Sequence, residues 1–256
     1  MSFLTDPNLP SDAVTAVIID GRTPQSMIAS LINMGITPIL TCPHSDVYSS
    51  VAYHPDIMLH HIGKNIIVYA PGTSAVLLSA LEQKGFKLVQ GYSKLGGKYP
   101  MTIPYNVARV GKYAIHNTKY TDPVIKEQLQ AMGIEFIHTN QGYAKCLTCV
   151  VNSNSIITSD ADIYKRALEA GLDVLLIEPD ETIRLEPLNM GFFGGATGLI
   201  GKNTLAVAGD LKFHKNCRKI LEFLSLKDVD VVMLNDEKLI DLGTIIPIQQ
   251  KQQHTF

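Results

Sequence analysis

Three separate segments carry side chains that could support nucleophilic catalysis. Cys146 lies near the middle of the chain, His54 and Asp56 lie near its start, and Asp241 lies near its end. A cysteine thiolate is a strong nucleophile, and a neighbouring histidine can act as a general acid and base. These residues therefore predict covalent catalysis, provided that the fold brings the three segments together. The alternatives are that Cys146 is a small apolar core residue and that Asp241 is a solvated acid in a turn.

The chain repeats one pattern five times, and this pattern must position those side chains. Each repeat has a short apolar run, an amphipathic helix that ends at Gly or Asp, and a second apolar run. The helix ends align at Asn33-Met34-Gly35, Gln83-Lys84-Gly85, Ala131-Met132-Gly133, Glu169-Ala170-Gly171 and Leu226-Lys227-Asp228. Glycine at this position tolerates the left-handed conformation that ends a helix. The approximate units are 12–63, 64–111, 112–152, 153–201 and 202–249.

A third strand closes each unit, so the units read as ββαβ. The turn Gly63-Lys64-Asn65 recurs as Gly201-Lys202-Asn203, where one unit leads into the next. A single unit cannot bury its apolar faces alone, so the units must pack side by side. Neither end of the chain has the polar composition of a capping repeat. We therefore predict an α/β fold, a closed pseudo-fivefold α/β-propeller of five ββαβ units, formed by a single domain over residues 1–256.

Composition argues against several kinds of partner. The chain has 22 Lys and Arg against 24 Asp and Glu, a net charge of −2, so we expect no nucleic acid partner. No apolar stretch approaches the roughly 20 residues that span a bilayer, so we expect no membrane partner. The N-terminal residues have no features of a secretory signal, and four cysteines are too few for a disulfide scaffold. These features favour the cytoplasm.

The five ββαβ units resemble the pentein superfamily, which includes arginine and agmatine deiminases, amidinotransferases and a non-catalytic translation initiation factor. The segment Tyr53–Leu59 resembles the His-x-Asp motif of the enzymes, and Gly142–Thr148 resembles their nucleophile segment. The segment Gly191–Thr197 resembles their acid-Gly-Gly motif, but Phe193 and Ala196 fill its acidic positions. His54 and Cys146 keep the two-unit offset of the family under a circular shift, and that shift moves the acidic position to Asp241.

The resemblance implies a guanidine-modifying hydrolase, of the deiminase or amidinohydrolase type, that acts on a small guanidino compound. It implies Cys146 and His54 as catalytic residues, with neither a metal ion nor a cofactor. Asp56, Asp241, Asn106 and Phe193 are the implied substrate-binding residues. The alternative is a catalytically inactive pentein-fold protein that binds a small molecule or a macromolecule, which the loss of acids at Phe193 and Ala196 would permit. Either protein could form homo-oligomers.

Strand geometry adds four smaller expectations. His54 and Asp56, two residues apart, should lie on one face of a strand. Cys146 and Cys149 should face opposite sides, and a bulge or an irregular strand end must absorb the different distances of Asp56 and Cys146 from their turns. His60 and His61 should point one inward and one outward. The glycine-rich run 194–201 resembles a phosphate-binding loop, but it should lead into a strand rather than a helix.

Overall fold

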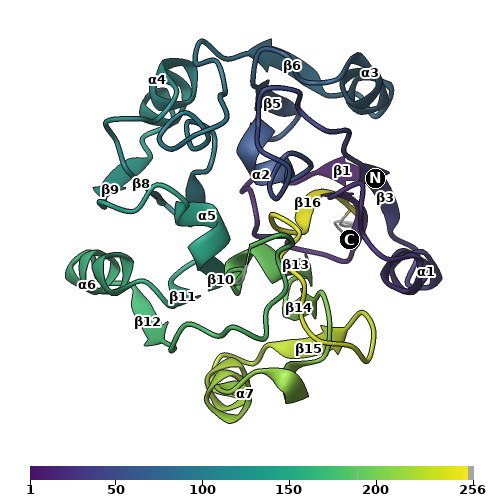
Figure 1. The fold of residues 1–256 in the computed structure, drawn as a ribbon, viewed down its shortest axis with the longest axis vertical. Coiled ribbons are helices and arrows are strands. Elements are labelled where there is room, and N and C mark those ends of the chain that lie inside the picture. The colour runs from purple at the N-terminus through teal and green to yellow at the C-terminus, as the bar shows by residue number, and fades with distance from the viewer. Residues whose placement is uncertain (189, 253–256) are drawn as a thin grey trace.

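The computed structural model describes residues 1–188 and 190–252, so the last four residues of the predicted domain lie outside the described part. Five small sheets are arranged around a common centre, with the longer helices at the periphery (Figure 1). No helix among the described residues is both long and apolar enough to cross a membrane. The α/β class that the sequence predicts is therefore observed.

Four of the sheets share one strand order. In each, the first strand pairs antiparallel with the second, and the second pairs parallel with the third. The sheets are β4 (Leu59–Gly63), β5 (Ile66–Tyr69) and β6 (Lys87–Gln90); β7 (Ala108–Val110), β8 (Tyr113–His116) and β9 (Glu135–His138); β10 (Thr148–Asn152), β11 (Ser155–Thr158) and β12 (Asp173–Leu176); β13 (Thr197–Gly201), β14 (Thr204–Val207) and β15 (Asp230–Met233).

The fifth sheet joins the two ends of the chain. Its order is β1 (Ser2–Phe3), β16 (Ile246–Gln250), β2 (Val14–Ile19) and β3 (Thr37–Leu40). Strand β16 pairs antiparallel with β2, with Ile246 opposite Ile18. The predicted pairing between the first and last units is confirmed, and β16 also pairs with β1 near the start of the chain (Figure 1).

A nine-residue helix connects the two parallel strands of every sheet, as parallel pairing requires. These helices are α1 (Gln25–Asn33), α3 (Ala75–Gln83), α4 (Pro123–Ala131), α6 (Ala161–Glu169) and α7 (Cys217–Ser225), and α7 follows the 3-10 turn η2 (Leu211–Phe213). The side chains of Ser74, Asp122 and Asp160 cap α3, α4 and α6. After four of the helices comes a glycine with positive φ, and after α7 comes Asp228 with φ 55°. The repeated helix ends are thus read correctly from the sequence.

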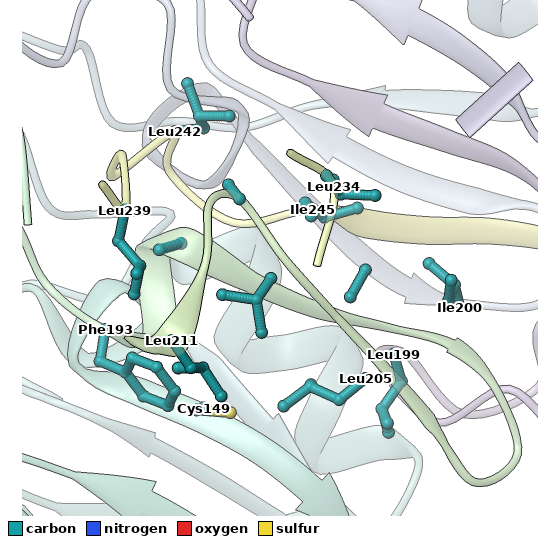
Figure 2. Close-up of a cluster of buried hydrophobic side chains, with 14 of the residues drawn as sticks. Cys149, Phe193, Leu199, Ile200, Leu205, Leu211, Leu234, Leu239, Leu242 and Ile245 are labelled. Atoms are coloured by element: carbon teal, nitrogen blue, oxygen red, sulfur yellow. The ribbon is translucent and has the colours of Figure 1, made fainter. Parts of the chain in front are cut away.

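Valine, isoleucine and leucine side chains fill the space between the sheets and the helices. Figure 2 shows one such cluster, in which Leu199 and Leu205 lie close together and Phe193 lies near Cys149. Cys149 and Leu205 are fully buried. This packing fixes the first strands of the sheets, and with them the short turns that precede those strands.

Three of the first strands begin with a short helical turn. Turn α2 (Pro55–Met58) precedes β4, α5 (Ala144–Leu147) precedes β10, and the 3-10 turn η1 (Gly194–Ala196) precedes β13. The prediction that His54 and Asp56 lie on one face of a strand is wrong, because Pro55 starts a helical turn and the strand begins only at Leu59. Asp56 is the second residue of α2, whereas Cys146 is the third residue of α5. The strands that follow the two turns have the same register shift. The helical turn, rather than an extra bulge, accommodates the different spacings.

Candidate active site

Turns α2 and α5 bring Cys146 next to Asp56 and His54. The Cys146 thiol donates to Asp56 Oδ2 over 3.2 Å. One ligating atom each of His54, Asp56 and Cys146 lies within 4.8 Å of the others, and all three residues are buried. His54 and Asp56 lie at turn α2, whereas Cys146 lies in turn α5, 90 positions after Asp56. The distance between them is short enough for proton transfer directly or through one water. The predicted meeting of the three side chains is observed.

Asn106 holds this arrangement from behind. Its side-chain amide donates to Cys146 Sγ over 3.2 Å and to the Asp56 carbonyl over 3.3 Å. Its Oδ1 accepts from the backbone amide of Lys145 over 2.8 Å. Asn106 is fully buried, and these hydrogen bonds to the protein occupy its side-chain amide and its Oδ1. It therefore fixes the two turns, whereas the sequence suggested that it touches substrate.

Asp241 is a buried acid rather than a solvated one. Its carboxylate accepts from the backbone amides of Phe192 over 2.8 Å and of Gly243 over 3.0 Å, and the residue is 2% exposed. Asp241 Oδ1 lies 3.9 Å from His54 Nδ1. On the other side of the ring, Asp20 Oδ2 lies 3.9 Å from His54 Nε2. The imidazole thus lies between two buried carboxylates, either of which would stabilise its protonated form.

Asp20 was missed in the sequence, although a signal for it was present. It directly follows β2, as the first polar residue after a buried apolar strand. Arg22 binds it through two hydrogen bonds, from Nε over 3.0 Å and from Nη2 over 2.7 Å. Arg22 also donates to the carbonyls of Ser49 and Ser50, which line the approach to His54. The segment Asp20-Gly21-Arg22 therefore belongs to the site.

Two further residues of the site, Lys145 and Thr244, gave no sequence signal. Lys145 is 5% exposed, and its Nζ donates to Thr244 Oγ1 over 3.2 Å and to the Thr148 carbonyl over 3.4 Å. The Thr244 hydroxyl donates to Asp56 Oδ2 over 2.9 Å. Thr244 has φ 77°, which is strained for a β-branched residue, and such strain concentrates at functional sites. A buried cation is thus linked to Asp56 through one hydroxyl.

Burial controls the protonation of the site. It raises the pKa of the Cys146 thiol well above the ordinary value, and the negative charges of Asp56 and Asp241 raise that pKa further. Burial lowers the pKa of His54, so the ring is a neutral base, and it raises the pKa of Asp241. Burial raises the pKa of Asp56 to about 6, although Lys145 and the hydrogen bonds from Cys146 and Thr244 oppose the rise. Without a bound cation, the resting site holds a neutral thiol beside a neutral imidazole.

A cavity of about 110 Å³ opens onto these groups. His54, Cys146 and Asp241 line it on the polar side, together with Tyr48, Val51, Tyr143, Leu185, Leu188, Met190 and Phe192. The Tyr143 hydroxyl lies 3.2 Å from that of Tyr48 and 2.7 Å from Thr102 Oγ1, which fixes this aromatic wall. The cavity therefore pairs carboxylates with aromatic faces, and both attract cations.

Phe193 does not line this cavity, contrary to its predicted role in substrate binding. It is 3% exposed and packs edge-on against His214, with ring centroids 5.4 Å apart. Its neighbour Phe192 faces the cavity instead. The adjacent backbone is a 3-10 turn, so the side-chain alternation of a strand does not apply at this point.

Other sequence features have structural roles. Cys149 lies in the apolar core (Figure 2), whereas Cys146 lines the cavity beside His54. The glycine-rich run 194–201 leads into strand β13, as predicted. The expectation that one of His60 and His61 points outward is wrong, because both are buried, at 5% and 4% exposure. Strand β4 lies close to the centre of the fold, so both of its faces are covered.

The same three side chains could also hold a metal ion. His nitrogen, cysteine sulfur and carboxylate oxygen are all ligands of zinc, and the ligating atoms of His54, Asp56 and Cys146 lie close enough to share one ion. Zinc binding would require the thiolate. Burial and two carboxylates disfavour that form in the resting site.

Several solved structures have a fold similar to that of this chain. The structure is similar to an amidinotransferase, SxtG, from Microseira wollei in the saxitoxin biosynthetic pathway (TM-score 0.63, 12% identity, 99% of each chain covered). It is also similar to the inosamine-phosphate amidinotransferase StrB1 from Streptomyces griseus (TM-score 0.62, 11% identity, 99% of this chain and 98% of that one). An agmatine deiminase from C. jejuni matches with TM-score 0.57 and 11% identity over 97% of each chain. No curated protein matches the sequence.

The chain thus has the fold of the pentein superfamily, and the resemblance predicted from the repeats is confirmed. Residues 18–246 match a family of unknown function, DUF6873, and the chain belongs to this family.

Proposed function

We propose that the protein is a guanidine-modifying enzyme that hydrolyses a small guanidino compound through Cys146. The observation that carries the proposal is the cluster of Cys146, His54 and Asp56 within 4.8 Å at a cavity whose wall includes Asp241. Burial of a thiol, an imidazole and several acids is costly, and a binding task for a cation gives a reason for it. The shared fold with amidinotransferases and an agmatine deiminase supports the same chemistry.

A guanidinium group matches the donors and acceptors of the cavity. It is planar, cationic and rich in N–H donors, and carboxylates accept from such groups in pairs. Asp241, which lines the cavity, would accept its N–H groups, while Tyr143 and Phe192 would cover its face. Burial holds the pKa of Cys146 high, and the negative charges of Asp56 and Asp241 raise it further. The bound cation would cancel the effect of these charges. Substrate binding itself would therefore generate the nucleophile.

The reaction then proceeds in two stages. The thiol proton moves to neutral His54, whose imidazolium form Asp20 and Asp241 stabilise. The thiolate attacks the central guanidinium carbon, an S–C bond forms, and the C=N electron pair moves to nitrogen. His54 returns its proton to the leaving amine as the C–N bond breaks. His54 then takes a proton from water, whose oxygen attacks the same carbon, and loss of the thiolate releases the product.

The architecture of the chain belongs to the same proposal. We assign the five sheets to a closed pseudo-fivefold α/β-propeller in a single domain, with units at about 12–63, 64–111, 112–152, 153–201 and 202–249. The common strand order and the pairing of β16 with β2 support this assignment. A ring explains how residues 54, 146 and 241 meet. We also assign the protein to the cytoplasm and a small guanidino compound as its partner.

The test is turnover of a panel of guanidino compounds with anionic, neutral and cationic tails. Wild-type protein should release ammonia or an amine from at least one member, and Cys146→Ala should abolish release with little change in the unfolding midpoint. Cys149→Ala is the matched control, since Cys149 is equally buried three residues away in the core. Adding an acceptor amine separates hydrolysis from transfer, because a transferase would release no free ureido product.

The alternative function is reversible binding of a guanidinium-type ligand without chemistry, and the raised pKa of the Cys146 thiol favours it. It predicts saturable binding of guanidino compounds with no product, and equal affinity in Cys146→Ala. Turnover that depends on Cys146 excludes this alternative.

A further inference from the structure

A second, much smaller cavity lies behind the Asp56 carboxylate, away from the Cys146 cavity. It measures about 20 Å³, and its lining includes Asp56, Leu59, His60, Tyr105 and Lys145. A water molecule needs about 10–15 Å³ by this measure, so the space fits one water and excludes a larger ligand. The lining is polar enough to hold it.

Three of the lining side chains, those of Asp56, His60 and His61, carry a buried polar atom that has no hydrogen-bond partner among the described residues. Asp56 uses Oδ2 to accept from Cys146 and Thr244, but Oδ1 has no hydrogen-bond partner among the described residues. His60 Nε2 likewise has no partner in the described part of the chain. Asp56 is 2% and His60 5% exposed, so bulk water does not reach these side chains freely. Leaving a buried acceptor unpaired is costly, and a bridging water removes that cost for both groups.

We propose that this cavity holds one ordered water molecule, which bridges Asp56 Oδ1 and His60 Nε2 and makes His60 a positioning residue for the Asp56 carboxylate. The water donates one hydrogen to Asp56 Oδ1 and the other to the ring nitrogen of neutral His60. Its oxygen accepts from the ammonium group of Lys145, which also lines the cavity. Three partners are the usual number for a buried water.

Such a water would hold the unused oxygen of Asp56 and so fix the carboxylate that faces Cys146. It would also stabilise the ionised form of Asp56 and oppose the rise in its pKa. The charged and titratable groups around Asp56 are Lys145, Cys146 and Asp241, and those around His60 are Arg109, His61 and His116. The bridge itself does not depend on the proposed function, because only its effect on turnover requires guanidinium chemistry.

The first test is direct observation of the water in the wild-type protein. A crystal structure at high resolution should show one ordered water within hydrogen-bond distance of Asp56 Oδ1 and His60 Nε2. A dry cavity, or a water bound to His61 instead, overturns the proposal. This measurement needs no variant and no substrate, so it stands even if the protein turns over no guanidino compound.

The second test measures the titration of Asp56 by carbon NMR of its labelled carboxyl group. His60→Phe keeps the ring shape but removes the nitrogen, so the pKa of Asp56 should rise by about one unit. His60→Gln, which keeps a polar group near the water, should restore most of the shift. His61→Phe is the comparison variant, because His61 lines the same cavity and its Nδ1 has no partner among the described residues, although its Nε2 pairs with the Lys64 carbonyl at 2.8 Å. An unchanged titration in a folded His60→Phe variant, or an equal shift in His61→Phe, overturns the role of His60.

Discussion

Turns α5 and η1 occupy equivalent places in neighbouring sheets, yet only α5 presents a nucleophilic side chain, that of Cys146. Each is a single helical turn directly before a first strand, β10 or β13, and the two strands have the same register shift at their far ends. Turn α5 presents Lys145 and Cys146, whereas η1 presents Gly194 and Gly195. The backbone frame is therefore common, and the side chains decide whether a turn is reactive.

The glycines of η1 provide space for the reactive turn. A methyl group on Gly194 would come within 2.6 Å of the Cys146 carbonyl oxygen, and one on Gly195 would overlap Asp241 Oδ1. Turn η1 thus lets the carboxylate of Asp241 enter from the last repeat. This arrangement explains how a site can lack acids at Phe193 and Ala196: the acid comes from a different segment and uses the room that the glycines leave.

The strongest test of this comparison is Gly195→Ala. The added methyl group must displace the Asp241 carboxylate, which two backbone amides hold in place. We expect turnover to fall by about 100-fold or more, the usual result of misplacing a site group by an ångström. Steady-state kinetics on the best guanidino compound measures it. Gly201→Ala, at the far end of the strand β13 that follows η1, would meet only the Thr204 side chain, at 3.3 Å from its hydroxyl, and should retain activity. Equal losses in both variants would refute the spatial role of Gly195.

Lys145→Met tests the charge on α5. Lys145 opposes the rise in the pKa of Asp56, so its removal should move that pKa from about 6 towards neutrality. We expect the acid limb of the pH–rate profile to move up by about one unit, with roughly a twofold loss at pH 7 and a nearly tenfold loss at about pH 5. Lys202→Met, in the exposed turn after β13, is the control and should leave the profile unchanged. A loss that is the same at every pH would mean that Lys145 only supports packing.

Asp56→Asn tests how much the buried charge of Asp56 lowers the free energy of unfolding. Because burial raises the folded-state pKa of Asp56 to about 6 from 3.8, its charge destabilises the fold above pH 6, and this penalty disappears as pH falls below 4. We expect Asn at this position to raise the free energy of unfolding by about 2 kcal/mol at pH 8, with no gain at pH 4. Denaturant unfolding at several pH values measures the difference. A gain that does not vary with pH would contradict the assigned cause.

Phe193→Leu tests the residue that directly precedes η1, and it should have the smallest effect on turnover. Phe193 packs in the core against His214, so we expect a loss of about 1 kcal/mol in stability and no change in kcat/KM. Phe192→Leu, which alters the wall of the Cys146 cavity, should instead raise KM. A kinetic effect of Phe193→Leu larger than that of Phe192→Leu would return Phe193 to the site.

Most of the fold could be predicted from the repeats, because helix ends and tight turns have strong local signals in the sequence. The glycines after the helices and the pairing of β16 with β2 followed from them. The side chains His54, Asp56, Cys146 and Asp241 were found through motif spacing. Short helical turns before strands have almost no sequence signal, so the strand positions predicted for His54 and Asp56 were wrong, and the packing of Phe193 beside η1 was not foreseen.

Residues that act through long-range contacts were missed for a different reason. Lys145 and Thr244 are 99 positions apart, and their hydrogen bond appears only when the chain ends meet. Asp20 binds locally to Arg22, but its approach to His54 depends on how β2 packs beside α2. Sequence periodicity describes single elements, and these contacts arise from their assembly.

The most direct test of the central claim measures how fast Cys146 is alkylated at pH 7 by two reagents of similar size. One reagent is neutral iodoacetamide, and the other is the amidine analogue, which is cationic. A cation held by Asp56 and Asp241 should lower the pKa of the thiol as it binds, so the amidine reagent should react at least about 100-fold faster after correction for intrinsic reactivity. Intact-protein mass and peptide mapping should place the adduct on Cys146, and Asp241→Asn should remove most of the preference. Equal corrected rates for the two reagents would contradict substrate-induced activation of Cys146.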